Sequence, residues 1–482
     1  MTFRRDSVSN WRAILPSTLI LALTACVPSG PGPGSNVNVK ANQWTWMSGS
    51  NTAGAVGVYG TLGSASASNL PGSRASAVSW TDSNNNFWLF GGVDSGAVGL
   101  NSDFNDLWEF NPTSKQWTWV SGSQNANASG VYGTMGTPAA GNVPGARNSS
   151  VSWTDLSGNF WLFGGYGFDS TGAQGGLNDL WEFNPTSKQW TWVSGSQKAN
   201  ALGVYGAIGA PAAGNVPGAR NSSVSWTDLS GNLWLFGGAG FDSIGAQGGL
   251  NDLWEFKPTS KQWTWVSGSQ KANALGVYGT IGAPAAGNVP GARNSSVSWT
   301  DLSGNLWLFG GAGHDSTGAQ GYLNDLWEFN PTSQQWTWMS GSQNANALGV
   351  YGTMGTPSAG NVPGARSYSV SWRDASNNLW LFGGYDGGSG DSTGAQGYFN
   401  DLWEFNPTSK QWTWVNGSNT EDAVSIYGTL NVTSASNVPG ARFGSVSWID
   451  TGHTNLWLFG GVGVGTAAGT TGYLNDLWWY QP

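Results

Sequence analysis

Cysteine, histidine and charged residues are scarce in this chain of 482 residues. It holds one Cys, at position 26, and two His, and only 9% of its residues are charged. A single Cys excludes a disulfide within the chain and leaves no thiol nucleophile beyond position 26. The formal net charge of −9 argues against a nucleic-acid ligand, because nucleic acids are bound by basic surfaces.

Long apolar runs are also missing. No run carries a 3.6-residue apolar period long enough for a helix. The longest apolar stretch, Ala13 to Leu23, is too short to span a bilayer comfortably and follows a basic segment with Arg4, Arg5 and Arg12. Residues 1–25 are therefore predicted to be a signal peptide and not part of the fold.

The signal peptide ends in Leu23-Thr24-Ala25-Cys26, which resembles a bacterial lipobox. The resemblance implies that Cys26 is lipidated on sulfur and becomes the new N-terminus. The alternative is a chance Cys in an ordinary signal peptide, which still leaves the protein exported. In the Gram-negative pattern, Val27 after the Cys favours the outer membrane. Residues 26–42 are rich in Pro, Gly and Ser and are predicted to be a flexible tether.

What the chain has in abundance is Gly (75) and Trp (32), and it has them periodically. The string Trp-Leu-Phe-Gly-Gly begins at Trp88, Trp161, Trp234, Trp307, Trp380 and Trp457, in steps of 73 residues and a last step of 77. A fixed period indicates one supersecondary unit repeated along the chain.

Four short runs rich in Trp, Phe, Val and Thr make up each unit, and turn residues bound each run. In the second unit the runs are residues 148–153, 160–163, 178–183 and 189–193. This composition predicts four strands per unit, called a to d, with the Gly pair closing strand b. Four strands with a Gly pair after the second is the plan of a β-propeller blade.

The unit resembles a kelch repeat. The resemblance rests on the Gly pair, on the aromatic pair Trp181 and Phe183 in strand c, and on Trp190 at the start of strand d. The resemblance covers residues 43–482 and implies an all-β, six-bladed kelch propeller with four-stranded blades, related to galactose oxidase. The first motif, Gln43 to Trp46, is a strand d with nothing before it, and the last, Asn475 to Tyr480, is a strand c with nothing after it. We therefore expect the N-terminal strand to close the last blade.

Loop lengths predict where a ligand would bind. Turns a–b and c–d share one face and are short, whereas loops b–c and d–a share the other and are long, so we expect a site on the long loops. His314 lies in a b–c loop and His453 in an a–b turn, so they are expected on opposite faces and unable to share a metal. Asp-rich b–c loops, such as the one with Asp169, lack the alternating acids of a calcium loop and are expected to be solvated turns.

Two repeated residue types are candidate ligand contacts, each with a structural alternative. One Tyr stands in each d–a loop: Tyr59, Tyr132, Tyr205, Tyr278, Tyr351 and Tyr427. These residues either form an aromatic platform for sugar rings or each fix their own loop to its blade. One Arg opens each strand a and binds an anion at the channel mouth or pairs with an acid of its own blade: Arg74, Arg147, Arg220, Arg293, Arg366 and Arg442. The acids expected in that pairing are Glu109, Glu182, Glu255, Glu328 and Glu404.

Near-identical second, third and fourth blades favour a binding or scaffold module for a glycan or protein of the cell envelope, because catalysis needs different groups at one point. The alternative is a carbohydrate-active enzyme, similar to a sugar epimerase, with an Arg-lined central pocket. The copper chemistry of galactose oxidase needs a Cys–Tyr crosslink and His ligands that this chain lacks. No catalytic residue, metal or cofactor is expected, and we expect a monomer that meets the membrane only through its lipid.

Overall fold

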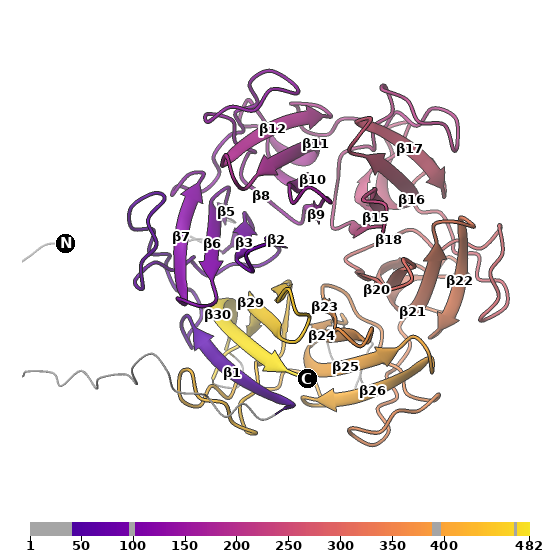
Figure 1. Ribbon diagram of the computed structural model, residues 1–482. Helices are drawn as coiled ribbons and strands as arrows, with labels where there is room; N and C mark the ends of the chain where they lie inside the picture. Colours follow the sequence, from indigo (N-terminus) through magenta and orange to yellow (C-terminus); the bar gives the residue numbers. More distant parts are fainter. Residues whose placement is uncertain (1–40, 96–101, 388–396, 467–469) are drawn as a thin grey trace, which may run out of the picture. The chain divides into compact units, whose positions relative to one another are not determined.

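The computed structural model describes residues 41–95, 102–387, 397–466 and 470–482. These residues form a six-bladed β-propeller built from strands without helices, arranged around a central axis (Figure 1). The expected signal peptide, Cys26 and the tether as far as residue 40 lie outside the described residues. Within the described ranges, no helix has the length and apolar character needed to cross a membrane.

Each blade is an antiparallel sheet in which strand a lies nearest the axis, followed outward by strands b, c and d. Strands a are β2 (Val78–Thr81), β9 (Val151–Thr154), β14 (Val224–Thr227), β19 (Val297–Thr300), β23 (Val370–Arg373) and β28 (Val446–Ile449). Strands b are β3 (Phe87–Phe90), β10 (Phe160–Phe168), β15 (Leu233–Phe241), β20 (Leu306–His314), β24 (Leu379–Tyr385) and β29 (Leu456–Val464).

The outer half of each blade consists of strands c and d. Strands c are β6 (Leu107–Asn111), β11 (Gln174–Asn184), β16 (Gln247–Lys257), β21 (Gln320–Asn330), β25 (Tyr398–Asn406) and β30 (Thr471–Gln481). Strands d are β7 (Gln116–Ser121), β12 (Gln189–Ser194), β17 (Gln262–Ser267), β22 (Gln335–Ser340), β26 (Gln411–Asn416) and β1 (Gln43–Ser48). Two-residue strands join four of the blade sheets: β8 (Arg147–Asn148), β13 (Arg220–Asn221), β18 (Arg293–Asn294) and β27 (Arg442–Phe443). Strands β4 (Val93–Asp94) and β5 (Ser102–Asp103) pair with each other in a separate two-stranded sheet.

The N-terminal strand closes the ring, as the sequence predicts. Strand β1 pairs antiparallel with β30, so that Trp44 lies opposite Tyr480 and Trp46 opposite Trp478. The first and last strands of the propeller therefore share the sixth blade, where they lie side by side in Figure 1.

The hydrophobic core is divided into six clusters, one at each interface between neighbouring blades. The cluster between the first two blades contains Trp80 and Trp88 from one blade and Phe160 and Trp181 from the next. Five further clusters repeat the arrangement around the ring, and Trp44 of β1 belongs to the one between the last two blades. Burial of Trp and Phe between blades thus replaces the missing disulfides as the stabilising element.

In blades two to six, strand b has a bulge at the Gly pair. In the second blade its pairing with strand c shifts register between Phe163 and Gly165. Gly164 has φ of 63°, a conformation that Gly adopts without steric cost. A Cβ on Gly164 would lie 2.8 Å from the carbonyl oxygen of Arg220 in the next blade. The motif therefore serves both the bulge and the close approach of neighbouring blades.

Candidate functional site

The six repeated arginines lie inside the blades, each in an ion pair with an Asp. In the second blade Arg147 donates from Nη1 to Asp179 Oδ1 and from Nη2 to Oδ2, both at 2.7 Å. Its remaining bonds go to the carbonyls of Gly145, at 2.9 Å, and Gly164, at 3.0 Å. The Arg147 side chain is 1% exposed and that of Asp179 is 0% exposed. This bidentate geometry fixes the Gly pair to the start of strand a.

The same pairing recurs in every blade and corrects the expected partner. The pairs are Arg74–Asp106, Arg147–Asp179, Arg220–Asp252, Arg293–Asp325, Arg366–Asp401 and Arg442–Asp476. The expectation that the arginines pair with Glu109, Glu182, Glu255, Glu328 or Glu404 is wrong. Glu255, for example, lies 3.7 Å from the exposed Lys257 instead. Because the guanidinium groups are buried and paired, this geometry favours a structural role for them over an anion site.

The tyrosines of the d–a loops converge on the same carboxylates. Tyr132 donates to Asp179 Oδ2 at 2.6 Å, and Trp181 Nε1 donates to that oxygen at 2.7 Å. Tyr59, Tyr205, Tyr278, Tyr351 and Tyr427 make the corresponding bonds to Asp106, Asp252, Asp325, Asp401 and Asp476. Each Tyr thus anchors its long loop to the following blade, and its ring packs on strand-c and strand-d Trp instead of facing solvent as a platform.

The buried network shifts the pKa of its members in consistent directions. Burial and then the charge of Asp179 raise the pKa of the Tyr132 phenol, so it stays protonated and donates. Burial lowers the pKa of Arg147, but the Asp179 carboxylate outweighs this effect and leaves it above its ordinary value. The Tyr132 phenol and the Arg147 guanidinium therefore both stay protonated across the physiological range.

Loop length had suggested that the d–a loops stay on one face of the propeller, and the structure shows that they do not. In the loop that leads into the second blade, Gly136 N donates to the carbonyl of Trp192 at 2.8 Å, and Ala139 forms a bridge with Trp190. The loop therefore lies along the outer strand β12 and covers the edge of that blade. An open strand edge promotes aggregation, so these long loops have a protective role. The face that carries the b–c loops is called the loop face below, and the opposite one the turn face.

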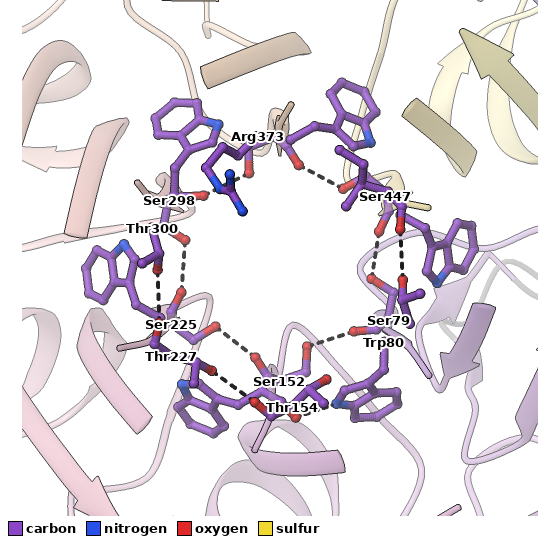
Figure 2. Close-up of a pocket in the computed structure, with 18 of the residues that line it drawn as sticks. Ser79, Trp80, Ser152, Thr154, Ser225, Thr227, Ser298, Thr300, Arg373 and Ser447 are labelled. Carbon is purple, nitrogen blue, oxygen red and sulfur yellow. Dashed lines mark hydrogen bonds between the residues drawn. The ribbon is translucent and has the colours of Figure 1, made fainter. Parts of the chain in front are cut away.

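A central channel runs along the axis and is lined by the six strands a. Its cavities, in order from the turn face to the loop face, have volumes of about 390, 200 and 130 Å³. Serine hydroxyls close a ring around it, each donating to the preceding blade's Ser carbonyl: Ser79, Ser152, Ser225, Ser298, Ser371 and Ser447 (Figure 2). Strand-a Trp side chains bond in the other direction, as Trp153 Nε1 does to the carbonyl of Trp234 at 3.0 Å.

The channel loses its symmetry at the turn face, in the fifth and sixth blades. Thr81, Thr154, Thr227 and Thr300 line the mouth in the first four blades, whereas Arg373 and Ile449 take the corresponding positions in the last two. Figure 2 shows the Arg373 side chain extending inward from the channel wall. His453 also lines the cavity, and its Nδ1 lies 3.1 Å from the carbonyl oxygen of Arg373.

At the loop face the asymmetry is aromatic. Phe443 contacts Tyr368, Tyr385 and Tyr398, with ring centroids 5.8, 5.7 and 5.2 Å apart. Tyr322 of the fourth blade packs edge-on against Tyr385 at 5.6 Å. We call these five residues the aromatic cluster. All five rings are half-buried, so part of each faces solvent.

Sequence reasoning missed the aromatic cluster and Arg373, although a blade-by-blade comparison contains both. Where Tyr322 and Tyr398 stand, the second and third blades have Gly176 and Gly249. Where Phe443 stands, three blades carry Asn. The Arg and Tyr that all blades share are structural, whereas the residues that differ between blades form the candidate site.

Three b–c loop aspartates, Asp169, Asp242 and Asp315, are buried and are not the solvated turn residues that the sequence suggested. The corresponding Asp391 lies outside the described residues. Asp169 is 2% exposed and accepts hydrogen bonds from the backbone of Thr171, Ala173 and Ala199. It fixes the b–c loop to the d–a loop that follows. Neighbouring loops at the rim of the loop face are therefore joined by hydrogen bonds.

Models of known protein families and curated proteins were compared with the chain, and none matches it.

Proposed function

We propose that this protein is an exported, lipid-anchored propeller of kelch type that acts as a binding module, and that the aromatic cluster is its contact surface for a glycan. The observation that carries the proposal is the gathering of Tyr322, Tyr368, Tyr385, Tyr398 and Phe443 on one side of the loop face. Half-buried aromatic rings are rigid and amphipathic, which suits them to stack on the apolar faces of sugar rings.

The propeller supports this use of the cluster by holding it rigidly. Tyr385 ends β24 and Tyr398 begins β25, and the two residues are paired across the sheet. Phe443 belongs to β27, which pairs with β29 of the sixth blade. Tyr322 belongs to β21 of the fourth blade. A ligand that covers the cluster would therefore contact three blades at once, and no strand has to move to receive it.

A binding role is favoured over the alternative of a sugar epimerase. That alternative needs arginines that line a central pocket and hold the carboxylate of the substrate. The six repeated arginines are buried in ion pairs, and none of them lines the channel cavities described above. A protein partner is the second candidate, because each d–a loop exposes a pair of apolar side chains such as Val131 and Met135.

Glycan-array binding of the full-length chain, purified in mild detergent, tests the proposal. The variant Tyr398→Gly with Phe443→Asn installs residues that other blades carry at these positions, so the fold is retained. We expect it to lose at least about tenfold in affinity for the glycan that the parent chain binds, as is typical for central aromatic contacts.

Tyr166→Ala provides the matched control. Tyr166 is 41% exposed and occupies in the second blade the position of Tyr385 in the fifth. We expect this change to leave affinity unaltered. Equal binding by the parent chain and the cluster variant, or an equal loss in the Tyr166 control, would refute the cluster as the glycan surface and direct the search to protein partners.

The lipid anchor rests on the resemblance to a lipobox and has its own test. Cells supplied with a fatty acid that carries an alkyne should label the parent chain, whereas Cys26→Ala should stay unlabelled and leave the membrane fraction. An unlabelled parent chain would leave an ordinary signal peptide as the explanation of residues 1–25.

A further inference from the structure

The turn-side end of the channel is a cavity whose wall repeats three residues from each blade. A Ser, a Trp and a third residue line it in every blade, and its volume is about 390 Å³. The third residue is Thr four times, and Thr81, Thr227 and Thr300 each donate to the preceding blade. Where Thr is replaced, by Arg373 and Ile449, the wall changes chemistry without a change in backbone, since β23 and β28 keep the pairing of their sister strands.

Arg373 differs from the six blade arginines in its unused hydrogen-bonding capacity. Its Nη1 donates to the carbonyl of Asp374 at 3.3 Å, and within the described residues its Nε and Nη2 donate to nothing. It takes part in no ion pair within the part of the chain that the structure describes. Burial lowers the pKa of this guanidinium, and the charges of Asp374 and Asp301 offset the effect in part.

The two nearby carboxylates are committed elsewhere. Asp374 accepts from Asn378 and from Trp380 Nε1 at 2.9 Å. Asp301 accepts from its own turn and from Trp307 Nε1 at 3.0 Å. Both carboxylates therefore raise the pKa of Arg373 without forming an ion pair with it. The inward side of the guanidinium remains available to a ligand.

A longer turn completes the cavity from the sixth blade. The a–b turn that starts at Asp450 is one residue longer than its counterpart from Asp155 to Asn159, and it carries His453. The backbone carbonyl of His453 accepts from Ala375 N at 3.1 Å, and its ring is bonded to the carbonyl of Arg373. The turn thereby reaches across to the fifth blade and holds the backbone beneath Arg373.

The opposite end of the channel is narrowed by a second feature of the fifth blade. The Tyr368 hydroxyl lies 3.3 Å from the Ser222 hydroxyl of the third blade, and both residues line the loop-side cavity of about 130 Å³. A ligand in the wide cavity therefore enters and leaves from the turn face.

We propose that the turn-side cavity binds a small oxyanion, a carboxylate or a phosphate, through the guanidinium of Arg373. The planar fork of Arg matches two oxygens of either group. The Ser hydroxyls of the wall and the hydroxyls of Thr81, Thr227 and Thr300 are occupied as donors. Arg373 therefore supplies the charge and the bidentate contact. This site lies on the face opposite the aromatic cluster and is independent of the proposed glycan surface.

Isothermal titration calorimetry of the full-length chain with sodium phosphate, and separately with sodium acetate, tests the proposal. Arg373→Thr restores the residue of the first four blades and should weaken saturable binding by about tenfold to a hundredfold, the range expected for a charge-assisted hydrogen-bond pair. Arg373→Lys keeps the charge without the fork and should bind with intermediate affinity.

Lys188→Thr serves as the control, because Lys188 is an exposed cation of the c–d turn and its loss changes net charge by the same amount. Binding of phosphate alone assigns the site to a phosphate, and binding of acetate alone assigns it to a carboxylate. The proposal is overturned if neither anion saturates the parent chain, if Arg373→Thr binds as tightly as the parent, or if Lys188→Thr weakens binding equally.

Discussion

Replacing Asp252 by Asn perturbs one copy of the buried network while preserving its shape. Asp252 accepts two bonds from Arg220, at 2.7 Å each, one from Tyr205 at 2.6 Å and one from Trp254 at 2.7 Å. An amide at this position has one oxygen, and its NH₂ group then faces donors. The buried guanidinium also loses its counter-charge.

The expected loss follows from the burial of the pair, whose side chains are 1% and 0% exposed. Removing one partner of a buried ion pair costs about 3–5 kcal/mol. The entropy of unfolding scales to about 0.9 kcal/mol/K for a propeller of about 440 residues. The melting temperature should therefore fall by about 3–5 °C, which differential scanning calorimetry resolves.

Glu255→Gln in the same strand is the control, since Glu255 lies near an exposed Lys257. A partly exposed pair of this kind contributes about 0–1 kcal/mol, so the melting temperature should change by about 1 °C or less. The reasoning fails if the Glu255 variant loses as much stability as the Asp252 variant, or if Asp252→Asn is neutral. Each single change leaves a buried group without its partner. The loss of unfolding free energy in the double variant Arg220→Met with Asp252→Asn should therefore be smaller than the sum of the two single losses.

Deleting residues 41–48 removes β1 and exposes the edge of β30, so we expect the product to aggregate. A soluble product that unfolds cooperatively would contradict the closure of the ring. Burial raises the pKa of Asp169, but hydrogen bonds from Thr171, Ala199 and Ala173 outweigh it and lower the pKa to about 2. This stabilisation is present above an ordinary pKa of about 4 and is lost as the pH falls toward 2, so Asp169→Asn should lower the melting temperature at pH 7 and not at pH 2. Ser225→Ala breaks one bond of the serine ring and should cost about 1 kcal/mol in urea unfolding; no change would show that the ring contributes nothing.

The architecture was predictable because its determinants are periodic. The unpaired motif at Gln43 to Trp46 and the incomplete last unit define the closure of the ring, and the pairing of Trp44 with Tyr480 confirms it. Such features depend on chain order and strand alternation alone, which the sequence displays directly.

The partners of the arginines were not predicted, because in five of the six blades two acids stand three residues apart at strand c. Asp179 and Glu182 point to opposite faces of β11, and the pattern does not reveal which face the Arg approaches. The sequence nevertheless contained a clue. Asn475-Asp476 preserves the Asp in the sixth blade, whereas Trp479 replaces the Glu there. An acid present in every blade is the better partner for an Arg present in every blade.

The course of the d–a loops was beyond sequence reasoning for a different reason. Loop length indicates how much chain is available but not where it runs. Contacts such as the bond from Asn142 Nδ2 to the carbonyl of Trp190, at 3.0 Å, form between residues far apart in sequence and depend on the finished blade. The aromatic cluster depends likewise on the position of one blade beside another.

The sharing of the sixth blade by β1 and β30 also sets an order of events during synthesis. Of the strands described, β1 is synthesised before all others, and its hydrogen-bonding partner, Thr471–Gln481, after all others. Until residues 471–481 have been synthesised, Trp44 has no blade to enter, and the propeller is an open arc with an uncovered strand edge at each end. Ring closure therefore cannot precede the synthesis of Thr471–Gln481, and a nascent chain cut short before Thr471 keeps both edges open, a feature that promotes aggregation.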